Sequence, residues 1–404
     1  MQEGDVMTID EAKELVVKAG IRLVESGLIA RTWGNVSCRI SENSFVITPS
    51  GRDYRSLTPD EIVAVNISDL SYSGSVKPST EKGLHSEVYK LHPEMNFVIH
   101  THQDNASVIS ASGLDSINIQ DGHSYLGSEV LCASYALPGT KALRRNIAHA
   151  LSRSKGKAII MKYHGALCFG KDYDEAFLVA SELENACHQL IVNQYLKLSG
   201  KDHFDAAEMN KFSLSLHNKV EEKNNEIFKP YYNSKRSKNG FVLYKDNGIE
   251  VEVQTNKIDS SQSEEAKIYH AIYDRYKNIH YIINKHTPEI TAVSHSDLIL
   301  RPLLDDFAQI AGASAKNVEN APGIITAALK KSSVVFVKNR GALCLGKSKD
   351  DAIAVGMVTQ KACKAYIGAS LFGNVKPINP LECALMRFVY LKKYSKQADK
   401  SLYI

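Results

Sequence analysis

The first half of the chain shows apolar residues in two periodicities, one helical and one alternating, which predict helices and strands in turn. A helical stripe begins at Thr8, an N-cap with a carboxylate three residues later, and stops near Gly27. The predicted strands cover residues 36–40, 44–48, 62–67, 97–102 and 158–163, and the other predicted helices cover 81–92, 104–112, 138–152 and 174–198. Strands that alternate with helices favour a layered α/β domain.

The chain of 404 residues is too long for one ordinary hydrophobic core, so we expect two domains. A polar stretch rich in Lys, Asn and Glu separates them. It places a first domain at 1–205, a helical extension and linker at 206–238, and a second domain at 239–404. The composition, 44% hydrophobic and 23% charged, is typical of a globular protein.

Charge and targeting features exclude several classes of protein. The net charge of +4 is small and spread along the sequence, so no nucleic-acid partner is expected. The acidic, amphipathic N-terminus lacks the layout of a signal peptide, and no run reaches the ~18 apolar residues of a membrane span. We therefore expect a cytoplasmic protein with no membrane partner, whose seven dispersed cysteines are reduced and mostly buried.

The second half of the chain repeats the first. The sequence Gly-Ala-Leu-Cys-Phe-Gly-Lys at 165–171 recurs 176 residues later as Gly-Ala-Leu-Cys-Leu-Gly-Lys at 341–347. Upstream, at an offset of 184 residues, Glu81, Tyr89, His102 and Pro138-Gly139 correspond to Glu265, Tyr273, His286 and Pro322-Gly323. One eight-residue deletion in a helix-to-strand connection reconciles the two offsets. The chain is therefore a tandem duplication.

The second copy differs from the first at the polar positions of the candidate site. Asn284 stands in place of His100 and Arg340 in place of His164, and we find no counterpart of residues 34–37 or 48–51. An arginine cannot lose its proton to bind a cation. We predict that the second copy keeps the fold and lacks a metal site.

Three histidines and one glutamate of the first copy suggest a metal centre. His100 and His102 follow an apolar run and share one face of the predicted strand, with Cα atoms roughly 7 Å apart. His164 follows another buried strand, and Glu81 begins a helix. Three neutral imidazoles with an open position are the layout of a catalytic zinc site, beside which a carboxylate serves as fourth ligand or general base.

Small polar residues around this centre suggest a phosphate pocket. Two turns offer backbone N–H groups and hydroxyls, and two further hydroxyls directly precede Glu81. The candidate phosphate-binding residues are Gly34, Asn35, Ser50, Gly51, Ser79 and Thr80. His85 and His92 are interpreted as structural residues.

These motifs resemble a known family. Thr-Trp-Gly-Asn-Val-Ser (32–37), Thr-Pro-Ser-Gly (48–51), Pro-Ser-Thr-Glu (78–81), His-Thr-His (100–102) and His-Gly (164–165) occur in the order and spacing of zinc-dependent class II sugar-phosphate aldolases, the family of L-fuculose-phosphate aldolase, L-ribulose-5-phosphate 4-epimerase and the adducin head domain. The resemblance covers about 10–198, with a degenerate copy at 263–367. It implies a three-layer αβα sandwich around a mainly antiparallel sheet, here duplicated in tandem.

The resemblance also implies roles for individual residues. His100, His102 and His164 would hold one Zn²⁺ per chain, in the first domain, and Glu81 would be the acid/base carboxylate. The predicted reaction is retro-aldol cleavage of a ketose 1-phosphate, a small sugar phosphate, to glycerone phosphate and an aldehyde. Members of the family take a tyrosine or aspartate from a neighbouring subunit, and Asp121 is the candidate here.

Two alternatives stay open. A 4-epimerase or dehydratase would use the same zinc and glutamate, and Trp33 before the Gly-Asn turn looks more like the epimerase. A non-catalytic, adducin-like scaffold is a different class, but it predicts eroded ligands. Because related enzymes form four-fold rings, we expect a homo-oligomer, in which two chains would make a pseudo-tetramer.

Overall fold

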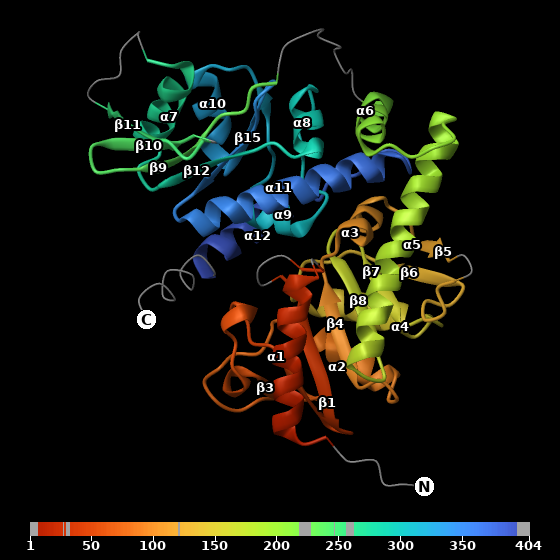
Figure 1. Cartoon of the computed structure of the whole chain (residues 1–404). Helices are drawn as coiled ribbons and strands as arrows, with labels where there is room; N and C mark the ends of the chain where they lie inside the picture. Colours follow the sequence, from red (N-terminus) through yellow and green to blue (C-terminus); the bar gives the residue numbers. More distant parts are fainter. Residues whose placement is uncertain are drawn as a thin grey trace. The chain divides into compact units, whose positions relative to one another are not determined.

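The chain forms two compact units, Met1–Asn193 and Gln194–Ile404. The computed structural model describes residues 7–26, 28–29, 33–119, 122–217, 228–245, 247–255 and 262–393 (Figure 1). Each unit contains one sheet covered by helices, which confirms the predicted duplicated α/β architecture.

The first unit is built on a sheet of eight strands in the order β3-β2-β1-β4-β8-β7-β6-β5. Every pairing is antiparallel except that of β6 with β7, so the sheet is mainly antiparallel as predicted. Its strands are β1 (Asn35–Ser41), β2 (Ser44–Ile47), β3 (Val63–Asn66), β4 (Phe97–Thr101), β5 (Ser116–Asn118), β6 (Glu129–Ala133), β7 (Ala158–Met161) and β8 (Gly165–Gly170). Its helices are α1 (Ile9–Glu25), α2 (Lys82–Leu91), α3 (Asp104–Ala111), α4 (Lys141–Leu151) and α5 (Tyr173–Ser199).

Helix α1 begins where its sequence predicts. Thr8 and Glu11 form a reciprocal capping box, in which the Thr8 hydroxyl accepts from Glu11 N at 3.3 Å and the Glu11 carboxylate accepts from Thr8 N at 2.8 Å. The helix buries one apolar stripe, which includes Val16 and Leu23, against β1 and β2.

Alternating side chains of the strands divide the core into two layers. Val98 and Phe169 pack with α2 and α4 in one hydrophobic cluster. Phe97 and Ile99 are equally buried but point to the opposite face. His100 follows Val98 by two residues, so it lies on the face that α2 covers, and Glu81 is the N-cap of α2.

Strand β8 is absent from the sequence prediction although it lies between β4 and β7. It is six residues long and has a glycine at each end, which is the composition of a turn. Both glycines lie where backbones approach closely: a methyl group on Gly165 would overlap the carbonyl of Thr101, and one on Gly170 would lie 2.6 Å from Ala176 N. The glycines therefore permit the pairing instead of interrupting it.

The second unit repeats the plan with seven strands in the order β11-β10-β9-β12-β15-β14-β13. Its strands are β9 (Asn233–Arg236), β10 (Gly240–Tyr244), β11 (Glu250–Gln254), β12 (Tyr281–Lys285), β13 (Asn317–Val318), β14 (Val334–Val337) and β15 (Gly341–Gly346). Its helices are α6 (Ala206–His217), α7 (Glu264–Arg275), α8 (Pro288–Ser294), α9 (Asp305–Ile310), α10 (Pro322–Ala328), α11 (Lys349–Ser370) and α12 (Pro380–Lys393). Helices α7 and α10 contribute to one core cluster, as α2 and α4 do in the first unit.

Strand β9 corrects one detail of the repeat. The sequence shows no counterpart of residues 34–37, but the register supplies one. Ser37 pairs with Val98 and Ser234 with Ile282, and Val98 and Ile282 are equivalent positions. Ser234 therefore takes the place of Ser37, and Arg236 that of Arg39.

Among the described residues, no helix is long and apolar enough to cross a lipid bilayer. All seven cysteines lie in the described part of the chain, where each is buried and unpaired.

Candidate metal centre and active site

Three imidazole rings lie together in the first unit. The ring centroids of His100 and His102 are 4.6 Å apart, those of His100 and His164 are 4.8 Å apart, and those of His102 and His164 are 5.1 Å apart. One ring nitrogen from each lies within 4.8 Å of the other two. His100 is fully buried and His164 is 5% exposed.

The sheet topology brings the three rings together. His100 lies near the end of β4 and His102 follows it, while His164 lies in the turn between β7 and β8. Since β8 pairs with β4, with Ala166 opposite Thr101, this turn lies beside the end of β4. Tyr163, just before His164, has the left-handed φ of 60° that closes the turn.

The hydrogen bonding of His100 leaves one ring nitrogen available to a cation. Its Nδ1 lies 2.9 Å from the carbonyl oxygen of Ala166, and because a carbonyl only accepts, Nδ1 carries the hydrogen. Its Nε2 lies 3.0 Å from His102 Nε2. Two imidazole nitrogens on one tetrahedral zinc ion are roughly 3.4 Å apart, since each Zn–N distance is about 2.0–2.1 Å. The three imidazoles could therefore hold one metal ion.

Glu81 completes the cluster. Its Oε1 lies 2.9 Å from His164 Nε2 and its Oε2 lies 3.4 Å from His100 Nε2. Burial raises the pKa of Glu81, but Coulombic interaction with His100 and His164 and hydrogen bonds from His164 and Asn35 outweigh it and hold the pKa well below its ordinary range. The carboxylate is therefore ionised and able to accept a proton or to bind a cation.

Asn35 contacts this carboxylate directly. It begins β1 opposite His100, is 4% exposed, and donates from Nδ2 to Glu81 Oε2 at 2.8 Å. Its Oδ1 lies 2.5 Å from Nε2 of His85, which is itself fully buried. From the sequence, Asn35 is predicted only to bind phosphate and His85 is interpreted as structural. The link between Glu81 and His85 could have been found from their four-residue spacing, which places both on one helix face.

The other candidate phosphate-binding residues lie on two turns that contact each other. Ser50 N donates to Lys77 O and Ser79 N donates to Thr48 O, both at 3.0 Å. Ser79 is buried and its hydroxyl accepts from Glu81 N at 3.2 Å, whereas Gly51 and Thr80 are exposed. Both turns therefore lie at the start of α2.

Gly34 lies beside β4, the strand that carries His100, and its φ of 124° favours glycine. A methyl group on Gly34 would lie 2.7 Å from the carbonyl oxygen of His100. Asp121, the candidate from a neighbouring subunit, lies outside the described residues.

The equivalent residues of the second unit cannot form the same centre. Asn284 donates from Nδ2 to Ala342 O at 3.4 Å, as His100 Nδ1 does to Ala166 O. The guanidinium of Arg340, at the position of His164, donates to Lys229 O at 3.1 Å and is a permanent cation. Within the described ranges, His100, His102 and His164 are the one group of histidine, cysteine or acidic side chains suited to a metal.

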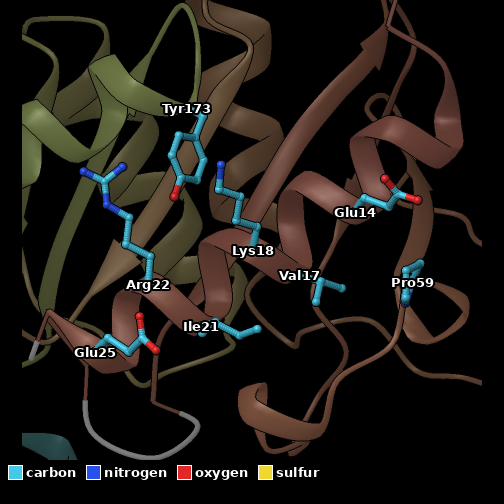
Figure 2. Close-up of a pocket in the computed structure, with 8 residues that line it drawn as sticks. All are labelled: Glu14, Val17, Lys18, Ile21, Arg22, Glu25, Pro59 and Tyr173. Carbon is cyan, nitrogen blue, oxygen red and sulfur yellow. The ribbon is translucent and has the colours of Figure 1, made fainter.

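A surface pocket of about 470 Å³ lies along α1, apart from the cluster (Figure 2). Two of its basic side chains already stack on Tyr173, with Lys18 Nζ 5.3 Å and Arg22 Cζ 5.1 Å from the ring centroid. None of the candidate site residues lines it; its lining is Glu14, Val17, Lys18, Ile21, Arg22, Glu25, Pro59 and Tyr173.

Comparisons with known proteins match both halves of the chain. A family model described as the class II aldolase and adducin N-terminal domain matches residues 14–191 and 232–367. The 5-deoxy-D-ribulose 1-phosphate aldolase of Bacillus thuringiensis serovar kurstaki is 30% identical over 179 residues, which are 44% of this chain and 83% of that protein.

Solved structures match about half of the chain. An L-fuculose 1-phosphate aldolase is 27% identical with a TM-score of 0.43, covering 51% of this chain and 95% of its own. The L-fuculose-1-phosphate aldolase of Thermus thermophilus is 26% identical with a TM-score of 0.40, covering 46% of this chain and 97% of its own.

Proposed function

The chain belongs to the class II aldolase and adducin N-terminal domain family, and from this membership we propose that it is a zinc-dependent aldolase that cleaves a ketose 1-phosphate. The observation that carries the proposal is the cluster of His100, His102 and His164 with Glu81 against two of the rings. The similar 5-deoxy-D-ribulose 1-phosphate aldolase supports a ketose 1-phosphate as substrate class.

The donor set favours zinc. Three neutral imidazoles with a nearby carboxylate are the ligands of catalytic zinc sites, and one ring nitrogen from each histidine lies within 4.8 Å of the other two. Zinc bound there would act as a Lewis acid that withdraws electron density from the substrate carbonyl. The Ala166 carbonyl fixes the tautomer and orientation of His100 through Nδ1.

Glu81 is proposed to move the proton. The C4 hydroxyl loses its proton as the bond between C3 and C4 breaks, which releases an aldehyde from C4 onward and leaves an electron pair shared between C3 and the C2 carbonyl. A proton returned to C3 then gives glycerone phosphate. Glu81 lies beside the imidazoles, and a positioned carboxylate of this kind contributes about 10²–10⁴-fold to a rate.

The turns at the start of α2 are proposed to bind the phosphate. Ser50, Gly51, Ser79 and Thr80 offer hydroxyls and backbone N–H groups beside the N-terminus of a ten-residue helix. That end carries the partial positive charge that favours an anion. Gly34 and Asn35 complete the proposed set from the start of β1.

The second half of the chain is proposed to bind no metal. It keeps Glu265 and His286 but has an amide and a guanidinium where the first half has imidazoles. We accordingly propose that residues 1–205 form the catalytic domain, that 206–238 connect the domains, and that 239–404 form a degenerate second domain.

The test is a cleavage assay on the zinc-loaded full chain with 5-deoxyribulose 1-phosphate, L-fuculose 1-phosphate and a panel of other ketose 1-phosphates. We expect equal amounts of glycerone phosphate and aldehyde from at least one substrate. Glu81→Gln should lower the rate by about 10²–10⁴-fold and His102→Ala should abolish it. His286→Ala, the equivalent substitution in the second half, is the control that should leave the rate unchanged. Aldehyde formation that survives both Glu81→Gln and His102→Ala would exclude the proposal.

A further inference from the structure

A chain of buried hydrogen bonds links Glu81 to the interior of the first unit. From Glu81 it passes through Asn35, His85 and Ser37 to Tyr89, with heavy-atom distances of 2.8, 2.5, 2.6 and 2.7 Å. His85 and Ser37 are fully buried, Tyr89 is 2% exposed and Asn35 is 4% exposed. The role of His85 in this chain is unused by the function proposed above.

The direction of every bond follows from the acceptor at its end. Asn35 donates from Nδ2 to Glu81 Oε2, which leaves its Oδ1 facing His85 Nε2. His85 Nε2 must then carry a hydrogen. Burial, followed by the charge of His100, lowers the pKa of His85 to about 3, so the ring is neutral and its Nδ1 accepts from the Ser37 hydroxyl. Ser37 in turn accepts from the Tyr89 hydroxyl.

The second unit shows which of these hydrogen bonds belong to the shared fold. Tyr273 donates to Ser234 at 3.2 Å, and Arg236 donates to the carbonyl of Tyr273 at 2.7 Å. These contacts repeat those of Tyr89 with Ser37 and of Arg39 with the carbonyl of Tyr89. The hydrogen bond between Tyr89 and Ser37 is therefore a feature of the fold in both units.

The hydrogen bonds of Asn35 with Glu81 and His85 have no equivalent at the corresponding positions of the second unit. Tyr269 replaces His85, and its hydroxyl donates to the backbone carbonyl of Tyr232 at 2.6 Å. Tyr232 occupies the register position of Asn35, so its side chain offers no amide to Glu265. The copy that lacks two of the three imidazoles also lacks the equivalents of His85 and Asn35, while its sheet and helix remain.

We propose that His85 is a positioning residue for Glu81, which acts by fixing the orientation of the Asn35 amide. Without the Nε2–H donor, Asn35 is free to turn its Oδ1 toward the carboxylate, where two acceptors oppose each other. Glu81 then loses its 2.8 Å hydrogen bond and its fixed place beside His100 and His164. This inference rests on the proposed aldolase function, because it assigns His85 to the same site.

The first test needs no substrate. ¹⁵N-detected NMR of the histidine-labelled full chain reports the tautomer of each ring. We expect His85 as a neutral ring protonated on Nε2 from pH 5 to pH 9, with or without zinc. A ring protonated on Nδ1, or a charged ring, would overturn the proposal whatever the enzyme activity.

The second test is a double-mutant cycle on the zinc-loaded chain, with the substrate that wild type cleaves. His85→Phe and Asn35→Ala should each lower kcat by about 10–100-fold, as loss of such supporting contacts typically does, and the double variant should be no slower than the slower single variant. For His85→Phe, KM and the zinc bound per chain should stay within about twofold of wild type. His85→Gln, which keeps a donor and an acceptor, should recover part of the loss.

Three outcomes would overturn the proposal: a kcat for His85→Phe within about twofold of wild type, losses that multiply in the double variant, or a loss of activity that follows loss of zinc. Should His85→Phe fail to fold, Ser37→Ala takes its place, since it breaks the chain one bond further from Glu81, with the same expectations. Tyr269→Phe, in the second unit, is the matched control and should leave kcat unchanged. A wild-type chain that cleaves no ketose phosphate would reject the proposed function, and the NMR result would still decide the orientation of the hydrogen bonds.

Discussion

Glu265 occupies in the second unit the position of Glu81, yet the pKa values of the two carboxyls shift in opposite directions. Burial raises the pKa of Glu265 to about 7, and the hydrogen bond from Tyr232 N and the charge of Arg340 only partly offset it. Burial also raises the pKa of Glu81, but Coulombic interaction with His100 and His164 holds it below its ordinary range. In the second unit the uncharged Asn284 stands in place of His100, and the raised pKa of Glu265 can be measured as stability.

The magnitude follows from linkage. A rise from 4.5 to about 7 corresponds to at most about 3.4 kcal/mol at 1.36 kcal/mol per pKa unit. Glu265 is partly exposed, so solvent screening reduces this to about 1.5–2 kcal/mol. The folded carboxyl keeps its proton to a higher pH than the unfolded one. The second unit therefore loses this free energy of unfolding as the pH rises from about 4.5 through about 7.

The perturbation is Glu265→Gln, and the assay is calorimetric unfolding of the full chain at pH 4.5 and pH 8. The introduced amide resembles the protonated acid and keeps an oxygen for the bond from Tyr232 N. We expect almost no change in Tm at pH 4.5 and a rise of about 4–7 °C at pH 8, in the transition of the second unit. Glu264→Gln, at an exposed neighbour, is the control and should shift neither. Equal shifts at both pH values would refute the reasoning.

Two further predictions concern packing and a buried ion pair. Gly165→Ala and Gly341→Ala each place a methyl group against a backbone carbonyl, of Thr101 and Lys285 respectively, so each should lower the Tm of its own unit in calorimetry. Only Gly165→Ala should also lower the zinc bound per chain, and equal zinc loss in both would contradict the account. Lys361→Met removes the 3.0 Å partner of the buried Asp306 and should cost about 3–5 kcal/mol at pH 8. Burial already raises the pKa of Asp306, so the loss in free energy of unfolding should be smaller at pH 4. Urea unfolding that shows the same loss at both pH values would be evidence against this explanation.

The centre could be predicted from the sequence because its residues lie in short local motifs. His100 and His102 lie two residues apart at the end of one strand, and His164 and Glu81 each follow or precede a predicted element. The duplication made the prediction easier, because Asn284 and Arg340 in the second half mark His100 and His164 as the positions at which the two halves differ in chemistry.

Register and side-chain direction could not be predicted. The equivalence of Ser37 and Ser234 appears only once the partners Val98 and Ile282 are known, because β9 is four residues long and has a different composition. Similarly, an asparagine in a Gly-Asn turn predicts a turn, not a contact with Glu81. Strand β8 was missed because its terminal glycines indicate a turn until the close backbone contacts are known.

The central claim is that one half of a duplicated chain holds the metal centre. The most direct test is the zinc content per chain after saturation with zinc and exhaustive dialysis, measured for wild type, His102→Ala and His286→Ala. The account predicts one zinc ion in wild type, none in His102→Ala and one in His286→Ala. Two tightly bound zinc ions in wild type, or retention of zinc by His102→Ala, would contradict it.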